Sequence, residues 1–530
     1  MTMEFGDRCA PRSEEKGLAV LLVGTDPLLT LLETELRKTG CAPVRLSLTG
    51  AASGSAEPAW GDAIREARWV LFASDERDSA ELPALEEACR QARIPLLPAV
   101  LAGGMGVAGP LVDPDSGWGW EAARRRLRLP AQVPESANRF RADDGTTAML
   151  ANVLVSEWLL ECSEPGRSRL REGRLYLLDM RTAEGSFHSF YPHPLAGGTR
   201  FSPRRLAEEW LMNPDQDRNP EPESESGRGP GLELGPDPES EPNGSGEVGE
   251  LHVFGRLTSP VTGILRVWDE GDLKQLPLSL CRARAADPLA VDGASLLPEE
   301  IGAGLTHREA RKEAGFAGIE AYVARMAGSE KRMERTYDWF GIGAGGTVPE
   351  AFNRALRQGL ARRLEKAAAE RPVVIRERRL GTIEDVHCRY CWRALAIELG
   401  TPPVLGEGEA CLGFPTMWVR AGGRWHGGVG LNRTLALRSA LQSALLSVCP
   451  PRPGAAPAAK REVRTTAAAD ESPPLDIPET EEMASARLAE DALRIVKTSR
   501  CRLSAYDLAL EPFLRREFAG VIGLVLEEEI

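Results

Sequence analysis

Two cysteines in the second half of the chain have a spacing that could support chemistry. Cys388 and Cys391 lie at the start of a predicted helix in HCRYCWRALAIELG. Residues three apart share one face of a helix, and a helix N-terminus lowers the pKa of a thiol. Zinc needs about four ligands, and His387, Cys411 and His426 are further candidates without a diagnostic spacing. Buried structural thiols, a zinc site and a redox site therefore all remain open.

A carboxylate stands out in another predicted helix, LTHREARKEAGFAGIEAYVARM (305–326). Glu320 lies there among small and aliphatic residues. A glutamate in this setting is either the remnant of a catalytic pair or a solvated or hydrogen-bonded helix residue. No Ser-His-Asp constellation can be singled out from the sequence.

The elements that must position these residues begin with a regular alternation in the first 200 residues. Apolar runs typical of buried parallel strands alternate with stretches of helical spacing. The order strand, helix, strand, helix predicts a doubly wound parallel sheet, closed by a β-hairpin. Strands are expected at 18–24, 43–48, 69–74 and 94–101, helices at 27–40, 81–92 and 147–162, and the hairpin at 174–180 and 185–194.

The first strand-to-helix turn does not have the composition of a nucleotide site. A dinucleotide-binding turn places glycines after the first strand, so that the backbone approaches the phosphates. Here the turn reads VGTDPLLTLL, in which Asp26 occupies the place of the second glycine and Pro27 lacks an amide donor. A carboxylate at this position repels phosphate, and no nucleotide is expected there.

Composition shifts divide the chain. Residues 208–250 hold thirteen acidic residues and two arginines, with almost nothing to bury, which predicts a disordered acidic linker. The predicted organisation is a disordered N-terminus at 1–16, a first domain at 17–207, the linker at 208–250, a mixed α+β domain at 251–449, a Pro/Ala-rich linker at 450–482, and a C-terminal segment at 483–530 that docks on the second domain.

Charge and cysteine content exclude several classes of function. The net charge of −13 comes mostly from the linker, so there is no basic footprint for nucleic acid. Ten scattered cysteines are too few for a disulfide scaffold. No apolar run reaches about 18 residues, and the first 16 residues are polar, so neither a membrane span nor a signal peptide is expected. We therefore expect a cytoplasmic protein.

The first domain resembles degenerate ThiF-like adenylating domains, on VLLVGTDPLLTLL, TAMLANVLVSEWLLE and LYLLDMRTAEGSFHSFYPHP. In related members the last motif continues into a zinc cysteine, whereas here His193 and Pro194 are followed by LAGG. The adenylation arginine also has no counterpart. The resemblance therefore implies a Rossmann-type fold and a pathway rather than a reaction.

The second domain resembles the YcaO family, on SPVTGILRVW, ARKEAGFAGIEAY, FGIGAGGTVPEAFNRALRQGLARRLEK and HGGVGLNRTLALRSALQSALL. These enzymes use ATP and Mg²⁺ to cyclise Cys, Ser or Thr onto a peptide backbone. Their first motif helix offers a serine and two glutamates, for which this chain has Glu313, Ala317 and Glu320. In the next helix, two further glutamate positions are matched to Arg362 and Glu365.

The later YcaO block contributes only Gln442. If the chain were active, the resemblance would assign catalysis to Glu320, Glu365 and Gln442. With half of the metal ligands replaced, the resemblance implies that ATP and magnesium are not bound productively. No cofactor is expected, and zinc at Cys388 and Cys391 remains open.

The chain as a whole resembles the Ocin-ThiF-like proteins, which mature thiazole-containing bacteriocins, most specifically in HCRYCWRAL and ALEPFLRREFAGVIGLVLEEE. The resemblance implies a non-catalytic partner that presents a precursor peptide to a YcaO cyclodehydratase and activates it. Members begin with a winged-helix domain whose sheet edge receives the leader peptide. Here about 16 polar residues precede the first strand, so either the start is misplaced or leader recognition lies elsewhere.

Two alternatives remain beside this scaffold. The chain could be an ATP-dependent peptide cyclodehydratase in its own right, or an unrelated zinc or thiol protein built around Cys388 and Cys391. The sequence does not distinguish a linear azole peptide from a thiopeptide as the product.

Overall fold

The computed structural model places most of both predicted domains. The predicted N-terminus at 1–16 and most of the acidic linker, 213–246, lie outside the described residues. The structure describes residues 20–48, 60–75, 81–102, 104–114, 118–128, 144–196, 201–212, 247–290, 293–329, 333–452, 463–466, 473–481, 483–499 and 501–528.

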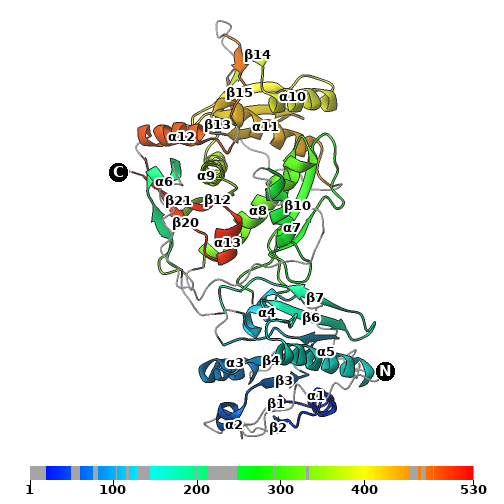
Figure 1. The fold of residues 1–530 in the computed structure, drawn as a ribbon. Helices are drawn as coiled ribbons and strands as arrows, with labels where there is room; N and C mark the ends of the chain where they lie inside the picture. Colours follow the sequence, from blue (N-terminus) through cyan, green and yellow to red (C-terminus); the bar gives the residue numbers. More distant parts are fainter. Residues whose placement is uncertain are drawn as a thin grey trace.

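The first domain is built on a seven-stranded sheet with the order β2-β1-β3-β4-β5-β6-β7 (Figure 1). The first four of these strands are parallel to one another, and β5, β6 and β7 each pair antiparallel with the strand before them. The strands are β1 (Leu21–Gly24), β2 (Val44–Ser47), β3 (Val70–Ser74), β4 (Leu96–Ala102), β5 (Met105–Ala108), β6 (Arg174–Asp179) and β7 (Gly185–Ser189).

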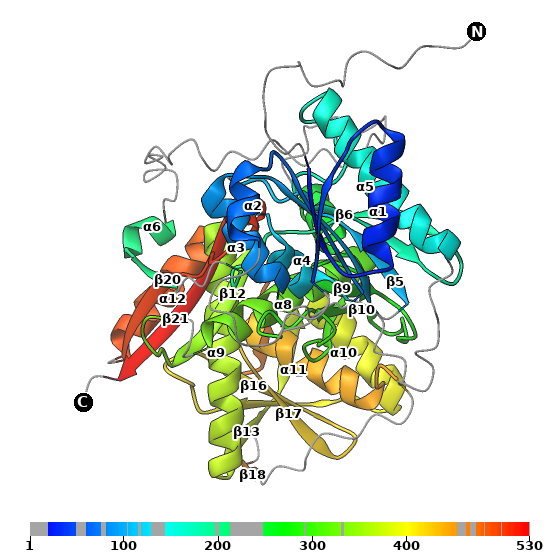
Figure 2. The same cartoon turned by 90° about the horizontal axis from the view of Figure 1, so that it is seen from below.

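Helices cover both faces of this sheet, which confirms the doubly wound architecture (Figure 2). On one face lie α1 (Leu28–Lys38) and α5 (Asp144–Ser163), and on the other α2 (Gly61–Glu66), α3 (Glu81–Ala92) and α4 (Trp120–Arg126). The expectation of a parallel sheet holds only as far as β4. The turn from β4 to β5 is too short for the crossover that a parallel pair requires, so β5 must return antiparallel.

The described residues from 201 onwards form four further sheets, with the orders β11-β10-β9, β12-β21-β20-β8, β17-β16-β15-β13-β18 and β14-β19. Their strands are β8 (Arg204–Leu206), β9 (Leu265–Asp269), β10 (Ser279–Ala285), β11 (Glu300–Gly304), β12 (Trp339–Gly345), β13 (Val373–Arg378), β14 (Leu380–Ile383), β15 (Val404–Gly408), β16 (Thr416–Ala421), β17 (Arg424–Val429), β18 (Val463–Thr466), β19 (Leu475–Ile477), β20 (Cys501–Asp507) and β21 (Gly520–Glu528).

Two long helices lie between these sheets. Helix α8 packs on β10 and β11, α9 packs on β12 and β21, and α10 and α11 pack together beside the five-stranded sheet. The helices are α6 (Glu208–Met212), α7 (Glu247–Leu257), α8 (His307–Ala327), α9 (Val348–Glu370), α10 (Val386–Leu399), α11 (Arg433–Val448), α12 (Ala486–Thr498) and α13 (Pro512–Glu517). None of the helices in the described ranges is long and apolar enough to cross a membrane.

Several elements cross the limits expected from composition. Strand β8 falls within the range predicted for the first domain, but it pairs with β20 near the C-terminus. Helices α6 and α7 extend into the two ends of the predicted acidic linker, and β18 and β19 lie within the predicted 450–482 linker. The C-terminal strand β21 lies between β12 and β20, so the tail is an inner strand of a sheet rather than a docked appendage.

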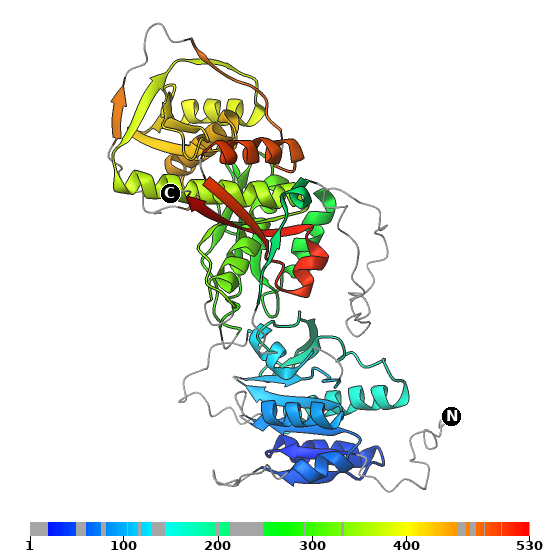
Figure 3. The ribbon, with the colours of Figure 1, turned by 90° about the vertical axis from the view of Figure 1, so that its left-hand side faces the viewer.

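The two halves meet at a buried polar joint, at the waist of the elongated molecule in Figure 3. Arg126, at the end of α4, donates from Nη2 to Oε2 of Glu511 (2.7 Å) and from Nη1 to the hydroxyl of Tyr322 (2.8 Å). The Tyr322 hydroxyl donates to Oε1 of Glu511 at 2.6 Å. The side chains of Arg126 and Glu511 are both 1% exposed, so each charge depends on the other for compensation.

Removing one member of this joint should be costly. We expect Glu511→Ala to lower the free energy of unfolding by about 3–5 kcal/mol, because it leaves the Arg126 guanidinium buried without a counter-charge. The measurement is urea denaturation followed by tryptophan fluorescence. Asp491→Ala is the matched control, since the Asp491–Arg494 pair is exposed and should contribute less than about 1 kcal/mol. Equal losses in the two variants would contradict this role for the joint.

Candidate functional site

The candidate site lies where α8 faces α9. Each helix follows a strand and begins with a threonine cap: Thr306 accepts a hydrogen bond from the amide of Glu309, and Thr347 accepts one from the amide of Glu350. Such caps satisfy the free amides of a first helical turn and fix where each helix begins. The two helices are thereby held in register with β11 and β12, and their charged side chains meet between them.

Arg354 of α9 occupies the centre of this site. Its Nε donates to Oε1 of Glu320 at 2.6 Å, and its Nη1 donates to Oε1 of Glu313 at 2.9 Å. The Arg354 side chain is 2% exposed, and its guanidinium lies over the ring of Phe316, 4.8 Å from the ring centroid. Burial would lower the pKa of Arg354, but the charges of Glu313 and Glu320 outweigh it and raise that pKa, so the cation persists.

A second arginine completes the arrangement. Arg357, one helical turn after Arg354, donates to Oε2 of Glu313 at 3.2 Å. Burial would raise the pKa of Glu313, yet the charges and hydrogen bonds of Arg354 and Arg357 bring that pKa down to about 2. Glu313 is therefore ionised and shared by two guanidinium groups at neutral pH.

Side-chain carboxylates also accept hydrogen bonds from backbone amides at the end of β12 and in the turn into α9. The amide of Ala344 donates to Glu320 at 3.2 Å, and the amide of Gly346 donates to Glu350 at 3.0 Å. Glu350 also forms an ion pair with Lys312, whose Nζ reaches Glu250 as well, at 3.1 and 2.9 Å respectively. A glycine-rich turn before a helix is a common anion site, and here internal carboxylates occupy its donors.

These contacts determine which chemistry the site can support. Hard cations such as Mg²⁺ take carboxylate oxygens as ligands, and phosphoryl transfer depends on such ions to offset the phosphate charge. Both α8 glutamates that face α9 bind a guanidinium group in this structure. Separating Arg354 from these carboxylates would break a buried ion pair, at a cost of about 3–5 kcal/mol.

The structure brings together only part of the residue set expected from the sequence. Glu320 is 7% exposed and ion-paired rather than solvated. Glu365 is exposed, eleven residues after Arg354 in α9 and so about 16 Å farther along the helix axis. Gln442 is half-buried in α11, and no hydrogen bond links it to Glu320 within the described ranges. Among the described residues, no hydrogen bond or ion pair joins any two of Glu320, Glu365 and Gln442.

Sequence reasoning missed three members of the site. Arg354 and Arg357 face the glutamates, although the family comparison pointed to Arg362 and Glu365 farther along α9. Glu300, the first residue of β11, lies close enough for the charge of Glu320 to raise its pKa, after burial as the larger cause. The signal available in the sequence was the pair of arginines three apart, Arg354 and Arg357, which match the spacing of a helical face.

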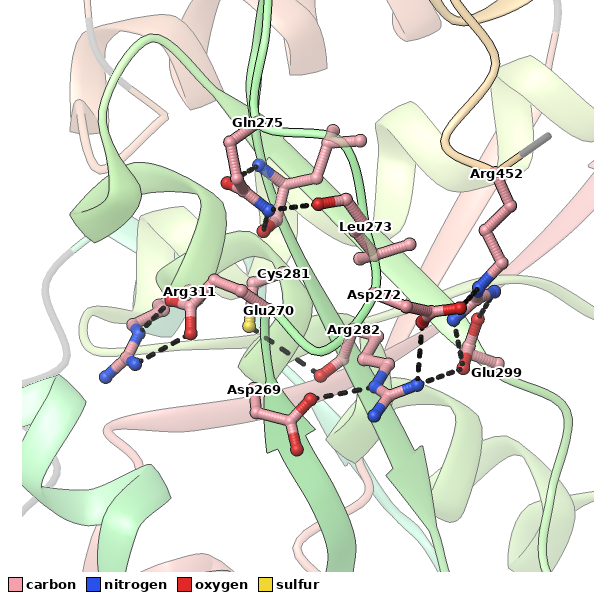
Figure 4. Close-up of polar contacts among 11 residues, drawn as sticks. Asp269, Glu270, Asp272, Leu273, Gln275, Cys281, Arg282, Glu299, Arg311 and Arg452 are labelled. Carbon is pink, nitrogen blue, oxygen red and sulfur yellow. Dashed lines mark hydrogen bonds and ion pairs between the residues drawn. The ribbon is translucent and has the colours of Figure 1, made fainter.

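A polar network around the loop between β9 and β10 helps to hold α8 in place (Figure 4). Arg282 donates to Asp269 at 2.8 Å and to Asp272 at 3.2 Å, while Arg452 donates to Asp272 at 2.9 Å and to Glu299 at 2.6 Å. Guanidinium groups alternate with carboxylates in this chain of contacts. Since Glu299 directly precedes β11, the network ties the segment after α11 to the strand that leads into α8.

The cysteine pair lies in a different environment from the one expected of a reactive site. Cys388 and Cys391 are 0% and 6% exposed, on the core side of α10, and Cys388 donates to the carbonyl of Thr434 at 3.6 Å. Asp385 caps the helix by accepting from the amide of Cys388 at 2.8 Å. Burial, followed by the charge of Asp385, raises the pKa of Cys388, and burial raises that of Cys391 to about 12. Desolvation thus outweighs the effect of the helix terminus.

The other proposed zinc ligands do not join this pair in a recognisable site. His387 points to Glu309, with 3.3 Å between His387 Nε2 and a carboxylate oxygen. Over the part of the chain that the structure describes, no three His, Cys, Asp or Glu side chains are arranged to hold a metal. Zinc binding remains a prediction for metal analysis to test.

The turn after β1 shows why its glycine is required. Gly24 has φ +147°, and a Cβ there would lie 1.8 Å from the carbonyl oxygen of Ala73. Asp26, in place of a second glycine, forms an ion pair with Arg45 at 2.5 Å. Gly24 therefore serves the packing of β1 against β3, and Asp26, two residues later, carries a paired carboxylate.

Comparison with known proteins identifies the architecture. No protein-family model matches the sequence, and no curated protein matches it. A heterocyclase solved in complex with substrate and cofactor is 13% identical; the alignment covers 96% of this chain and 80% of that one, with a TM-score of 0.54. The heterocyclase TruD is 15% identical, with 96% and 79% covered and a TM-score of 0.50.

These likenesses extend over nearly the whole chain, and at such low identity they establish the fold alone. The chain has the fold of these heterocyclases, and this confirms the fold class expected from the sequence: a doubly wound, Rossmann-type domain followed by an α+β domain. What the chain does with this fold depends on its own residues.

The low pKa of Glu313 predicts a specific pH dependence. Because the folded-state pKa lies below its ordinary value of 4.5, the stabilisation is present above pH 4.5 and is lost as the pH falls towards 2. We expect Glu313→Gln to be less stable than the parent at pH 6. Between pH 5 and 3, the variant should lose less free energy of unfolding than the parent does. Urea denaturation at each pH measures this. The exposed Glu365→Gln is the control, and an equally steep loss in Glu313→Gln would contradict the assignment.

Burial of the cysteine pair predicts slow alkylation. In the folded protein at pH 8 we expect iodoacetamide to label Cys388 and Cys391 at least about tenfold more slowly than the half-buried Cys501, because neutral, buried thiols are poor nucleophiles. Mass spectrometry after timed labelling, with and without urea, makes the comparison. Rapid labelling of Cys391 in the folded chain would favour the redox interpretation. Stoichiometric zinc that is lost in Cys388→Ser would favour the metal interpretation.

Proposed function

We propose that this chain is a non-catalytic partner of a separate YcaO-type cyclodehydratase in the biosynthesis of thiazole- or oxazole-modified ribosomal peptides. In this role it presents the precursor peptide and activates the enzyme. The heterocyclase fold supports the pathway, and the Arg354 contacts support the absence of catalysis. The single observation that carries the proposal is the guanidinium of Arg354 held between Glu313 and Glu320.

Electrostatic interactions at the site support a role without catalysis. A YcaO-type reaction requires carboxylates that are free to hold Mg²⁺ next to a triphosphate. Here one glutamate of α8 is shared by two arginines and the other is buried against one. Two fixed cations in place of a mobile metal neutralise the carboxylates and leave no vacancy for the ion. The fold is retained while the metal-binding function of its motif helices is lost.

A chain that keeps this fold can act as a binding partner without catalysing a reaction. A protein with the shape of a heterocyclase can associate with an active one through surfaces that the two share, and its charged helices then serve stability. The competing hypothesis of an independent cyclodehydratase requires cooperation between Glu320 and Glu365. Glu365 is exposed and lies about 16 Å farther along α9 than Arg354, the partner of Glu320, and this disfavours the hypothesis.

Turnover of radiolabelled ATP separates the two hypotheses. We expect the purified chain alone, with Mg²⁺ and a Cys-rich peptide, to release phosphate no faster than buffer. Adding the chain to an active YcaO-type cyclodehydratase and its precursor peptide should raise azoline formation at least about tenfold, by positioning the peptide. ATP turnover by the chain alone that is abolished in both Glu320→Ala and Glu365→Gln would overturn the proposal. The exposed Arg494→Ala serves as the matched control for purification.

A further inference from the structure

The four-stranded sheet has an incomplete outer edge. Strand β20 pairs along its whole length with β21, from Cys501 opposite Glu528 to Asp507 opposite Ile522. On its other side, β8 pairs only with Ala505–Asp507. The first four residues of β20, 501–504, have no strand beside them among the described parts of the chain. Main-chain groups at such an edge are free to pair with another extended segment.

A groove lies along this unpaired stretch. It has a volume of about 670 Å³ and is lined by the start of β20, the end of β8, α6 and α12. Leu206, Leu211 and Val496 contribute buried apolar surface to it. Four extended residues, which would cover the unpaired stretch 501–504, span about 14 Å.

The charged side chains that line the groove indicate which kind of peptide it would bind. The groove is lined by Arg205, Lys497 and Arg502 and by one acidic residue, Glu208, which pairs with Lys497 at 2.6 Å. Arg205 also donates to the hydroxyl of Ser504 at 3.2 Å, on the unpaired part of β20. Arg205 and Arg502 have no carboxylate partner within the groove lining, and Glu527, which stands opposite Arg502 on β21, is not part of that lining. The lining therefore has a net positive charge, and the complementary ligand is acidic.

We infer that this groove binds an extended acidic peptide, supplied by a separate molecule, which adds to the sheet as an antiparallel strand beside Cys501–Ser504. The peptide would continue the line of β8, which is itself antiparallel to β20. Main-chain hydrogen bonds to β20 provide the pairing, the apolar floor takes alternate side chains, and Arg205 and Arg502 attract the acidic ones. The inference rests on the sheet edge and its charges and does not depend on the function proposed above.

The test uses a fluorescent six-residue peptide of alternating glutamate and valine and the full chain. We expect saturable binding by anisotropy, together with slower amide hydrogen exchange over residues 501–504. Arg502→Glu should weaken binding about tenfold or more, because it reverses one of the two attracting charges. Arg494→Glu is the matched control, since Arg494 lies in the same helix as Lys497 outside the groove lining and should leave binding unchanged.

Two further probes distinguish strand addition from simple charge attraction. The same peptide N-methylated at alternate residues keeps its charge and loses main-chain donors, so it should not bind. A lysine–valine peptide should not bind either. The inference would be overturned if the N-methylated peptide bound as tightly as the unmodified one. It would also be overturned if Arg502→Glu and Arg494→Glu weakened binding equally.

The chain's own acidic stretch provides one more outcome. Residues 213–246 follow α6 in the sequence. If replacing them with a neutral Gly/Ser segment exposes amides 501–504 that are protected in the parent without any peptide, the occupant is the chain itself. The inference of a separate peptide would then be wrong. Unchanged exchange in that variant supports an edge that is open to another molecule.

Discussion

The buried ion pair of Arg354 with Glu320, extended to Glu313, is the constraint around which the second half of the molecule is organised. A guanidinium group that is almost fully buried is tolerated only with carboxylates at hydrogen-bond distance. Because the carboxylates come from α8 and the cation from α9, this requirement fixes the two longest helices against each other. It also engages the carboxylates of Glu313 and Glu320 in hydrogen bonds with guanidinium groups.

A second buried cluster gives the molecule its overall shape. Arg126 and Glu511 are 385 residues apart in sequence, yet they form a direct ion pair that Tyr322 completes. The first domain, α8 and the C-terminal segment meet at this point. Together with β21 as an inner strand, the joint makes the end of the chain essential to the fold. In both clusters a charge is buried and compensated from a distant part of the chain, which favours one arrangement over others.

More of the fold than of the site could be predicted from the sequence. Apolar runs and helical spacing predicted the strands and helices of the first domain, because burial of alternate or periodic faces is a local property. Within the site, helical periodicity predicted which residues share a face of α9, but not which turn of that helix lies opposite α8. Arg354 and Glu365 are eleven residues apart, close to three full turns, so they share a face of α9, while only Arg354 lies opposite Glu320. Which turn faces α8 depends on how β11 and β12 lie in their sheets.

The sequence alone determined the composition of the acidic stretch, the alternation of strands and helices in the first domain, the residue types at Glu313, Ala317 and Glu320, and the presence of two cysteines at the start of a helix. Those follow from residue identity and short-range spacing. Only the tertiary structure decided that Arg354 fills the place between the glutamates, that burial of the cysteines outweighs the helix terminus, and that β8 leaves part of β20 uncovered. Each of these depends on the distance between side chains far apart in sequence, and on the desolvation that accompanies their contact, which no local pattern records.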